Sequence, residues 1–139
     1  MNLHNELEGI TVLSLEQAVS APYCGMLLAD AGARVIKVER PEGDFARGYD
    51  TSVNGNSSIF GWLNRGKESI CLDINKHSDR ELLGRMIKKS DVLLSNLAPR
   101  ALTRKGFSSN FIRGLNSKII NCSISGYGST GLTSNLKAY

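Results

Sequence analysis

The chain has 139 residues and a mass of 15.1 kDa, enough for one domain with a single core but not for two. Hydrophobic residues make up 41% and no apolar run reaches the roughly 20 residues of a membrane-spanning helix, so we expect no membrane partner. The net charge is +4, but the basic residues are scattered among 13 acidic ones, which disfavours nucleic acid and favours a small anionic ligand. The N-terminus lacks the pattern of a secretory signal, so we expect a cytoplasmic protein.

The first part of the chain has the pattern of a β-α-β unit. Two apolar, β-branched runs of strand length, residues 9–15 and 33–39, flank a helical segment. Pro22 suits the first turn of that helix, and Gly32 offers a left-handed stop at its end. Because such crossovers are right-handed, the two strands should be parallel. The polar, glycine-bearing residues 40–56 predict a long surface loop.

Strands and helices continue to alternate after this loop. In chain order, the pattern predicts a short helix or turn over residues 57–66, a strand over 68–74, an amphipathic helix over 77–90, a strand over 91–97, short helices over 99–106 and 109–116, and a strand over 118–125. The alternation predicts an α/β fold with a Rossmann-like, doubly wound, mainly parallel sheet and helices on both faces. We expect residues 1–139 to form a single region of this kind.

The usual catalytic and metal-binding patterns are missing. Cys24, Cys71 and Cys122 lie far apart, without C-x-x-C spacing or a neighbouring histidine, so we expect buried, reduced thiols and no metal site. His4 falls near the terminus and His77 at the start of a helix, where neither is placed as a general base. No G-x-S-x-G motif is present. The residues alone therefore predict a fold and an anion site, but no reaction.

One glycine-rich stretch spells a dinucleotide motif, because residues 126–131 read "GYGSTG". A working G-x-G-x-x-G follows the first strand, opens a helix and precedes an acidic residue by about 20 positions. The stretch here follows the last predicted strand and has no helical stripe and no acidic residue after it. We interpret it as a tight glycine loop over a neighbouring site. An NAD-dependent enzyme remains as an alternative, which predicts NADH binding.

Ligands of open parallel sheets bind beyond the carboxyl ends of the strands. The residues that leave those ends are Glu16 to Ser20, then Glu39 and Arg40, Asp73, Ser95 to Ala98, and Ser125 with Gly126. Arg40 and Arg104, with Lys105 and Lys137 near them in sequence terms, suit a multiply phosphorylated ligand through charge-assisted hydrogen bonds. Composition alone favours the plainer interpretation, in which these are solvated surface charges.

The stretches discussed above resemble the class III CoA-transferases of the CaiB/BaiF type, the family of formyl-CoA transferase and the crotonobetainyl/carnitine CoA-transferases. The matching pieces, in order from Leu7 to Tyr139, are "LEGITVLSLEQAVSAPYCGMLLADAGARVIKVERPEGDFARGY", "NRGKESICLDI", "KKSDVLLSNLAP", "RKGF" and "SGYGSTG". Two stretches that overlap the first and second pieces, "DFARGYD" and "FGWLNRGKESICLD", look most like the branch that acts on dicarboxylic acyl groups.

The resemblance implies transfer of CoA from an acyl-CoA to a free carboxylic acid through intermediates on an aspartate, without a metal, in an interlocked homodimer. It places contacts with CoA or acyl-CoA at Ala18, Val19, Ser20, Arg40, Leu72, Asn96, Leu97, Ala98, Arg104, Lys105 and Lys137. Val19 stands where formyl-CoA transferase has a glutamine that assists at its active site, and Asn75 and Lys105 also differ. These departures argue against formyl or oxalyl specificity, not against the family.

The resemblance also implies that the nucleophilic aspartate lies beyond Tyr139, so we expect no catalytic residue in this chain. On the same resemblance we expect the smaller domain and the returning C-terminal segment of the family to be absent, so residues 1–139 should correspond to part of the large domain and be inactive alone. One alternative is a non-catalytic or split-gene subunit that needs a separate C-terminal half. Another is an α-methylacyl-CoA racemase, but Tyr139 stands where racemases have a histidine, and they shorten the loop before Asn64.

Overall fold

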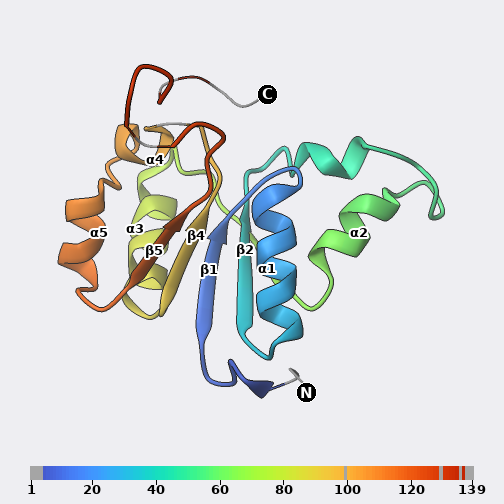
Figure 1. Cartoon of the computed structure of the whole chain (residues 1–139), viewed down its shortest axis with the longest axis horizontal. Helices are drawn as coiled ribbons and strands as arrows, with labels where there is room; N and C mark the ends of the chain where they lie inside the picture. The colour runs from blue at the N-terminus through green and yellow to red at the C-terminus, as the bar shows by residue number, and fades with distance from the viewer. Residues whose placement is uncertain (1–4, 99, 129, 135, 137–139) are drawn as a thin grey trace.

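The computed structural model describes residues 5–98, 100–128, 130–134 and 136, and Figure 1 shows its arrangement. Within this part, five strands form one sheet in the order β3-β2-β1-β4-β5, and each pairing is parallel. The strands are β1 (Thr11–Leu15), β2 (Arg34–Glu39), β3 (Glu68–Cys71), β4 (Val92–Ser95) and β5 (Ile120–Ser123). This order matches the first five strands of a Rossmann sheet and confirms the predicted parallel α/β fold.

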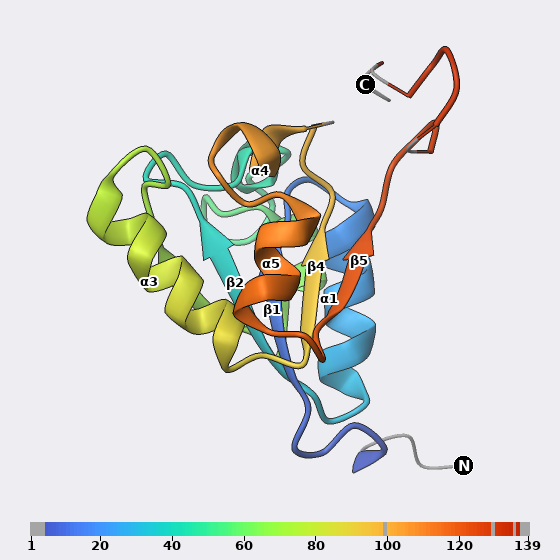
Figure 2. The ribbon, with the colours of Figure 1, turned by 90° about the vertical axis from the view of Figure 1, so that its left-hand side faces the viewer.

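Helices cover both faces of the sheet, as a doubly wound fold requires. Figure 1 shows α1 and α2 on one face and α3 and α5 on the other, and Figure 2 shows α3 and α5 in front of the sheet with α1 behind it. The helices are α1 (Ser20–Asp30), α2 (Ser58–Asn64), α3 (His77–Lys88), α4 (Ala101–Arg104) and α5 (Ser109–Leu115), and a short 3₁₀ helix η2 (Phe45–Gly48) lies in the loop after β2. In the described part of the chain, no helix has the length and apolar character needed to cross a membrane.

The core consists of two layers, because successive side chains of a buried strand point to opposite faces. Val12 and Leu94 pack toward α1 with Ala21. Their neighbours along the strands, Leu13 and Leu93, belong to the cluster on the α3 and α5 face. The other fully buried members of that second cluster include Leu83, Ile87 and Ile112. Both clusters fix the strand ends from which the candidate site is built.

The predicted boundaries of the first crossover helix agree with the structure. Pro22 is the third residue of α1. Gly32 has φ +94°, and the N–H of Ala33 donates to the carbonyl of Leu28 at 3.0 Å, so the chain leaves the helix through a left-handed residue. The strand predicted over residues 68–74 is shorter, because β3 ends at Cys71.

The prediction that all three cysteines are buried is wrong. They are free thiols, but Cys71 is exposed and Cys24 and Cys122 are only half-buried. Cys71 lies on β3, an edge strand whose side chains are largely exposed, so an alternating pattern did not mean burial there. Cys24 packs against the α1 cluster, where burial, followed by the neighbouring Cys122, raises the pKa of its thiol.

Candidate functional site at the carboxyl edge of the sheet

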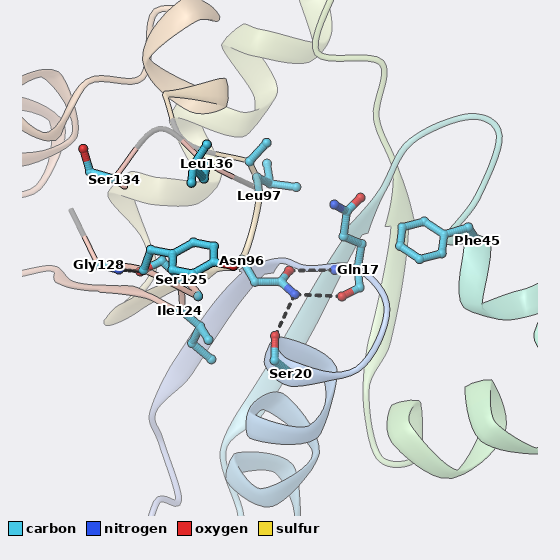
Figure 3. A pocket seen from close by; sticks show the side chains of 13 residues that line it. Gln17, Ser20, Phe45, Asn96, Leu97, Ile124, Ser125, Gly128, Ser134 and Leu136 are labelled. Atoms are coloured by element: carbon cyan, nitrogen blue, oxygen red, sulfur yellow. Dashed lines mark hydrogen bonds between the residues drawn. The ribbon is translucent and has the colours of Figure 1, made fainter. Parts of the chain in front are cut away.

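A cavity of about 370 Å³ lies at the carboxyl ends of β1, β4 and β5, where the strand order reverses (Figure 3). In Rossmann-like sheets this switch point is the usual place for a ligand. Segments that are distant in sequence line it, including Gln17, Ser20, Phe45, Asn96, Leu97 and Tyr127. The described lining residues are all uncharged, so the cavity suits a neutral, partly apolar group.

A second cavity of about 250 Å³ adjoins the first along the same edge. The two share Gln17 and Leu97 as lining residues. The second cavity also contains Arg40 after β2 and Leu72 after β3. Three carboxylates, those of Glu16, Glu39 and Asp44, also line it, and each is paired with a lysine or arginine of the protein. A ligand extending across both would pass from a neutral cavity to a charged one.

The predicted contact residues divide between these cavities and the surrounding surface. Ser20, Asn96, Leu97 and Ala98 line the first cavity, and Arg40, Leu72 and Leu97 line the second. Ala18 is buried in the turn between β1 and α1, whereas the next residue, Val19, is 46% exposed. The turn after β1 therefore has one side toward the core and the other toward solvent.

Two predicted cations lie elsewhere, on the surface beyond these cavities. Arg104 is exposed at the end of α4 and is not among the described residues that line either cavity. Lys105 is exposed, donates to the side chain of Asn75, and borders a separate hollow between α3 and α5. The last predicted cation, Lys137, falls outside the described residues.

The side chain of Asn96 ties β4 to the turn after β1. Its Oδ1 accepts the N–H of Gln17 at 2.9 Å, and its Nδ2 donates to the carbonyl of Gln17 at 2.8 Å and to the hydroxyl of Ser20 at 3.0 Å (Figure 3). Asn96 is only 8% exposed, so these bonds form away from solvent. The Asn96 amide group is thus already engaged in holding the wall of the cavity.

Arg40 is held at one end only. Its Nε donates to the carbonyl of Gly43 at 2.9 Å and lies 4.0 Å from the carboxylate of Glu42. Its two terminal nitrogens form no hydrogen bond with the described residues, and the side chain is 56% exposed. This geometry leaves the outer part of the guanidinium free for an anionic ligand.

A buried charge cluster adjoins the second cavity, which two of its members, Glu16 and Asp44, help to line, and the sequence interpretation missed it. Glu16, Lys37, Asp44 and Lys67 all have side chains no more than 2% exposed. Lys37 Nζ lies 2.8 Å from Asp44 and 3.4 Å from Glu16, and Lys67 Nζ lies 2.5 Å from Glu16. Two carboxylates thus face two ammonium groups. Burial lowers the pKa of Lys67, although Glu16 opposes that effect.

A sequence signal for this cluster exists in the pattern of β2. Val35, Lys37 and Glu39 alternate along the strand, so the three side chains share one face. Because parallel sheets are covered on both faces, a charged residue in such a strand is expected to be buried and to need a partner. The sequence does not indicate which residues are paired in the cluster, because its members are distant along the chain; Glu16 and Lys67, for example, are 51 residues apart.

Asp44 connects this cluster to the wall of the site. Its Oδ1 accepts the N–H groups of Ala18 at 3.1 Å and Ala46 at 3.0 Å, while Oδ2 faces Lys37. Ala18 has φ +63°, a left-handed conformation that costs a residue with a Cβ about 1 kcal/mol or more. The turn between β1 and α1 is therefore held in a conformation that alanine alone would not prefer.

Glu39 and Arg47 form a second ion pair beside the cluster. Arg47 donates from two nitrogens to the Glu39 carboxylate at 2.9 and 2.8 Å, and the N–H of Asp44 donates to it at 3.1 Å. Burial alone would raise the pKa of Glu39, but the hydrogen bonds from Arg47 and Asp44 outweigh it and lower the pKa to about 2. The carboxylate thus stays charged over the whole physiological range.

Substituting Glu39→Gln should make the free energy of unfolding less dependent on pH in the acidic range. The pKa of Glu39 falls from 4.5 to about 2 on folding, so its contribution is complete above about pH 4.5 and is lost as the pH falls toward 2. Because Arg47 is half exposed, we expect a loss of about 2 kcal/mol at pH 7 and almost none near pH 2. Urea unfolding at several pH values measures it, with the exposed Glu8→Gln as control. An equal loss at every pH would contradict this assignment.

Comparison with known proteins places the chain in a family. The sequence profile of CoA-transferase family III matches residues 7–139. The chain is 38% identical over 133 residues to an acetyl-CoA:oxalate CoA-transferase of Acetobacter aceti, covering 95% of this chain and 34% of that protein. It is 44% identical over 124 residues to a formyl-CoA:oxalate CoA-transferase of Afipia carboxidovorans, covering 88% of this chain and 29% of the relative.

Further relatives agree with this placement. A succinate–glutarate CoA-transferase of Agrobacterium fabrum is 36% identical over 141 residues, with 96% of this chain and 35% of that protein covered. A solved structure of a CaiB/BaiF family protein from Brucella suis superimposes with a TM-score of 0.91 and 35% identity, covering 98% of this chain and 37% of that one. The chain belongs to CoA-transferase family III. It spans about a third of the length of the relatives it matches.

Proposed function

We propose that residues 1–139 are the CoA-binding N-terminal part of a CoA-transferase that moves CoA from an acyl-CoA to a free carboxylic acid. The observation that carries this proposal is the pair of adjoining cavities at the carboxyl edge, one neutral and one in which Arg40 has a free guanidinium end while the lining carboxylates are paired within the protein. The family membership supports the same ligand class. Succinate and glutarate occur in the name of one relative, so we propose a dicarboxylic acid as the acceptor.

The charges along the edge suggest how CoA lies across it. The pantetheine arm is long and uncharged, which fits the neutral cavity between Gln17 and Tyr127. The phosphates carry the charge, which fits the free guanidinium end of Arg40 in the second cavity. We propose further contacts from the turns at 18–20 and 96–98, from Leu72, and from the cations Arg104, Lys105 and Lys137.

The two carboxylates of the buried charge cluster are poor candidates for the nucleophile. Glu16 and Asp44 are buried and paired with lysines, so neither presents a free oxygen to a substrate. We therefore propose that the aspartate of the family's reaction is supplied from outside residues 1–139, and that this chain alone does not turn over. In a complete enzyme we propose a cytoplasmic homodimer.

A second candidate function is a non-catalytic subunit that completes a transferase with a separate C-terminal half. The chain covers about a third of each relative, and in this candidate a separate chain supplies the remaining part of the enzyme. Co-expression with a C-terminal half tests this candidate. A complex with transferase activity would support it, and the absence of any complex would exclude it.

Replacing Arg40 and Arg104 together with alanine should weaken CoA binding at least about tenfold, because each arginine contributes charge-assisted hydrogen bonds to the phosphates. The matched control is Arg85→Ala with Arg113→Ala, two exposed arginines on α3 and α5 whose loss changes the net charge equally. Isothermal titration calorimetry gives both affinities. Equal affinity of the two double variants would remove the proposed phosphate contacts.

A further inference from the structure

Asp44 occupies an unusual position at the start of η2. It is 5% exposed, and its carboxylate is shared among three chain segments. One oxygen accepts the N–H of Ala18 in the turn after β1 and the N–H of Ala46 in η2, and the other bonds to Lys37 of β2 at 2.8 Å. Because this carboxylate is already saturated by partners in the protein, it has no role as a free acid or base.

The turn that Asp44 holds forms the boundary between the two cavities. Gln17, which lines both, has its backbone N–H and carbonyl bonded to Asn96 from the β4 side. The next residue, Ala18, has its N–H bonded to Asp44 from the β2 side and adopts φ +63°. Figure 3 shows the Gln17 side chain extending between Leu97 and Phe45, away from these backbone anchors.

We propose that Asp44 is a positioning residue for CoA binding, which holds Ala18 in its left-handed conformation and thereby directs Gln17 to the junction of the two cavities. This inference rests on the proposed function, because it concerns the affinity of the same site. Asp44 also lines the second cavity, but both of its carboxylate oxygens are engaged within the protein, so it acts through the turn. The hydrogen bond from the Ala18 N–H to Asp44 offsets the free-energy cost of the positive φ. Without this acceptor, Ala18 should shift toward conformations that its Cβ favours.

The first test compares CoA affinity in two aspartate variants. At a temperature where circular dichroism shows that the variant is folded, Asp44→Ala should weaken CoA binding roughly tenfold. This factor corresponds to the free-energy cost of the left-handed conformation of Ala18. Asp91→Ala is the matched control, because Asp91 also accepts a backbone N–H, from Thr11 at 2.8 Å, but at the amino end of the sheet. It should lower stability and leave the affinity unchanged. Unchanged affinity in Asp44→Ala would overturn the proposal.

The second test is a rescue that a purely structural role would not produce. Glycine adopts a positive φ without penalty, so Ala18→Gly added to Asp44→Ala should restore most of the lost affinity without restoring the melting temperature. Failure of this rescue would show that Asp44 does not act through the conformation of Ala18, and would also overturn the proposal.

A readout without ligand separates this inference from the proposed function. Hydrogen exchange of the Ala18 amide, followed by NMR, should be slow in the wild type and much faster in Asp44→Ala, with little change in Asp91→Ala. If the wild type binds no CoA, the proposed function fails while the exchange measurement still decides whether Asp44 holds the turn. Equal exchange of the Ala18 amide in the wild type and in Asp44→Ala would refute the positioning role.

Discussion

Substituting Lys37→Met should destabilise the fold by about 3–5 kcal/mol, the cost of removing one partner from a buried ion pair. Methionine nearly preserves the volume of the side chain, so the loss is electrostatic. Lys37 bonds to Asp44 at 2.8 Å and approaches Glu16 at 3.4 Å, with a side chain that is only 1% exposed. Its removal leaves two carboxylates with a single ammonium group, that of Lys67.

Urea unfolding measures this effect, with Lys89→Met as the matched control. Lys89 is exposed after α3, so the same substitution there should change the free energy of unfolding by less than about 0.5 kcal/mol. Adding Asp44→Asn to Lys37→Met should recover part of the loss, because the excess negative charge is then removed. Similar unfolding midpoints for the two methionine variants would contradict the existence of the buried charge cluster.

The second large effect is expected from Gly25→Ala in the middle of α1. A Cβ built on Gly25 would lie 2.8 Å from Glu16 Oε2 and 3.2 Å from Lys67 Nζ. Those atoms are the ends of side chains, but both are buried and paired with each other, so neither can move aside easily. We expect a loss of about 2–3 kcal/mol, although alanine is the better helix former.

Gly61→Ala in α2 provides the matched control for that substitution. Nothing lies within 4 Å of the position where its Cβ would be, so the variant should gain about 0.5–1 kcal/mol from helix propensity alone. The two glycine variants are therefore expected to shift the melting temperature in opposite directions. A stabilising effect of Gly25→Ala would mean that Glu16 and Lys67 do not pack against α1 as described.

Much of the fold could be predicted because its local signals agree with its packing. The apolar runs of β1 and β4 are typical of parallel strands buried on both faces, and the pattern from Pro22 to Gly32 indicated the limits of α1. The edge strands were harder. Side chains on β3 and β5 are mostly exposed, and Ile120 is 64% exposed, so hydrophobic pattern did not indicate burial there.

The site could be predicted only in part, because its geometry depends on contacts between distant residues. The position of Ser20, Asn96 and Arg40 after their strands was enough to predict that they lie at the ligand-binding edge, and they line the two cavities. It was not enough to show that Asn96 bonds to Gln17 across 79 residues. Nor could it show that Asp44 accepts the N–H of Ala18 across 26 residues. Such partners follow from the three-dimensional packing of the sheet ends.

The glycine-rich stretch at 126–131 illustrates the difference between a motif and its setting. Gly128 and Gly131 have φ of +79° and +89°, which agrees with a tight loop that only glycine adopts freely. Gly126 and Gly128 line the neutral cavity beyond β5, and no described helix begins there. The glycines therefore lie at the site, but they follow the last strand of the sheet and lack the helix and acidic partner of a dinucleotide clamp.

The wild-type arm of the calorimetric titration tests the central claim most directly. CoA and NADH are titrated separately into the 139-residue chain, whose folded state is first verified by a cooperative melting transition. CoA binding at the carboxyl edge predicts one saturable site for CoA and no heat of binding for NADH. Binding of NADH, or no binding of CoA by the folded chain, would contradict it.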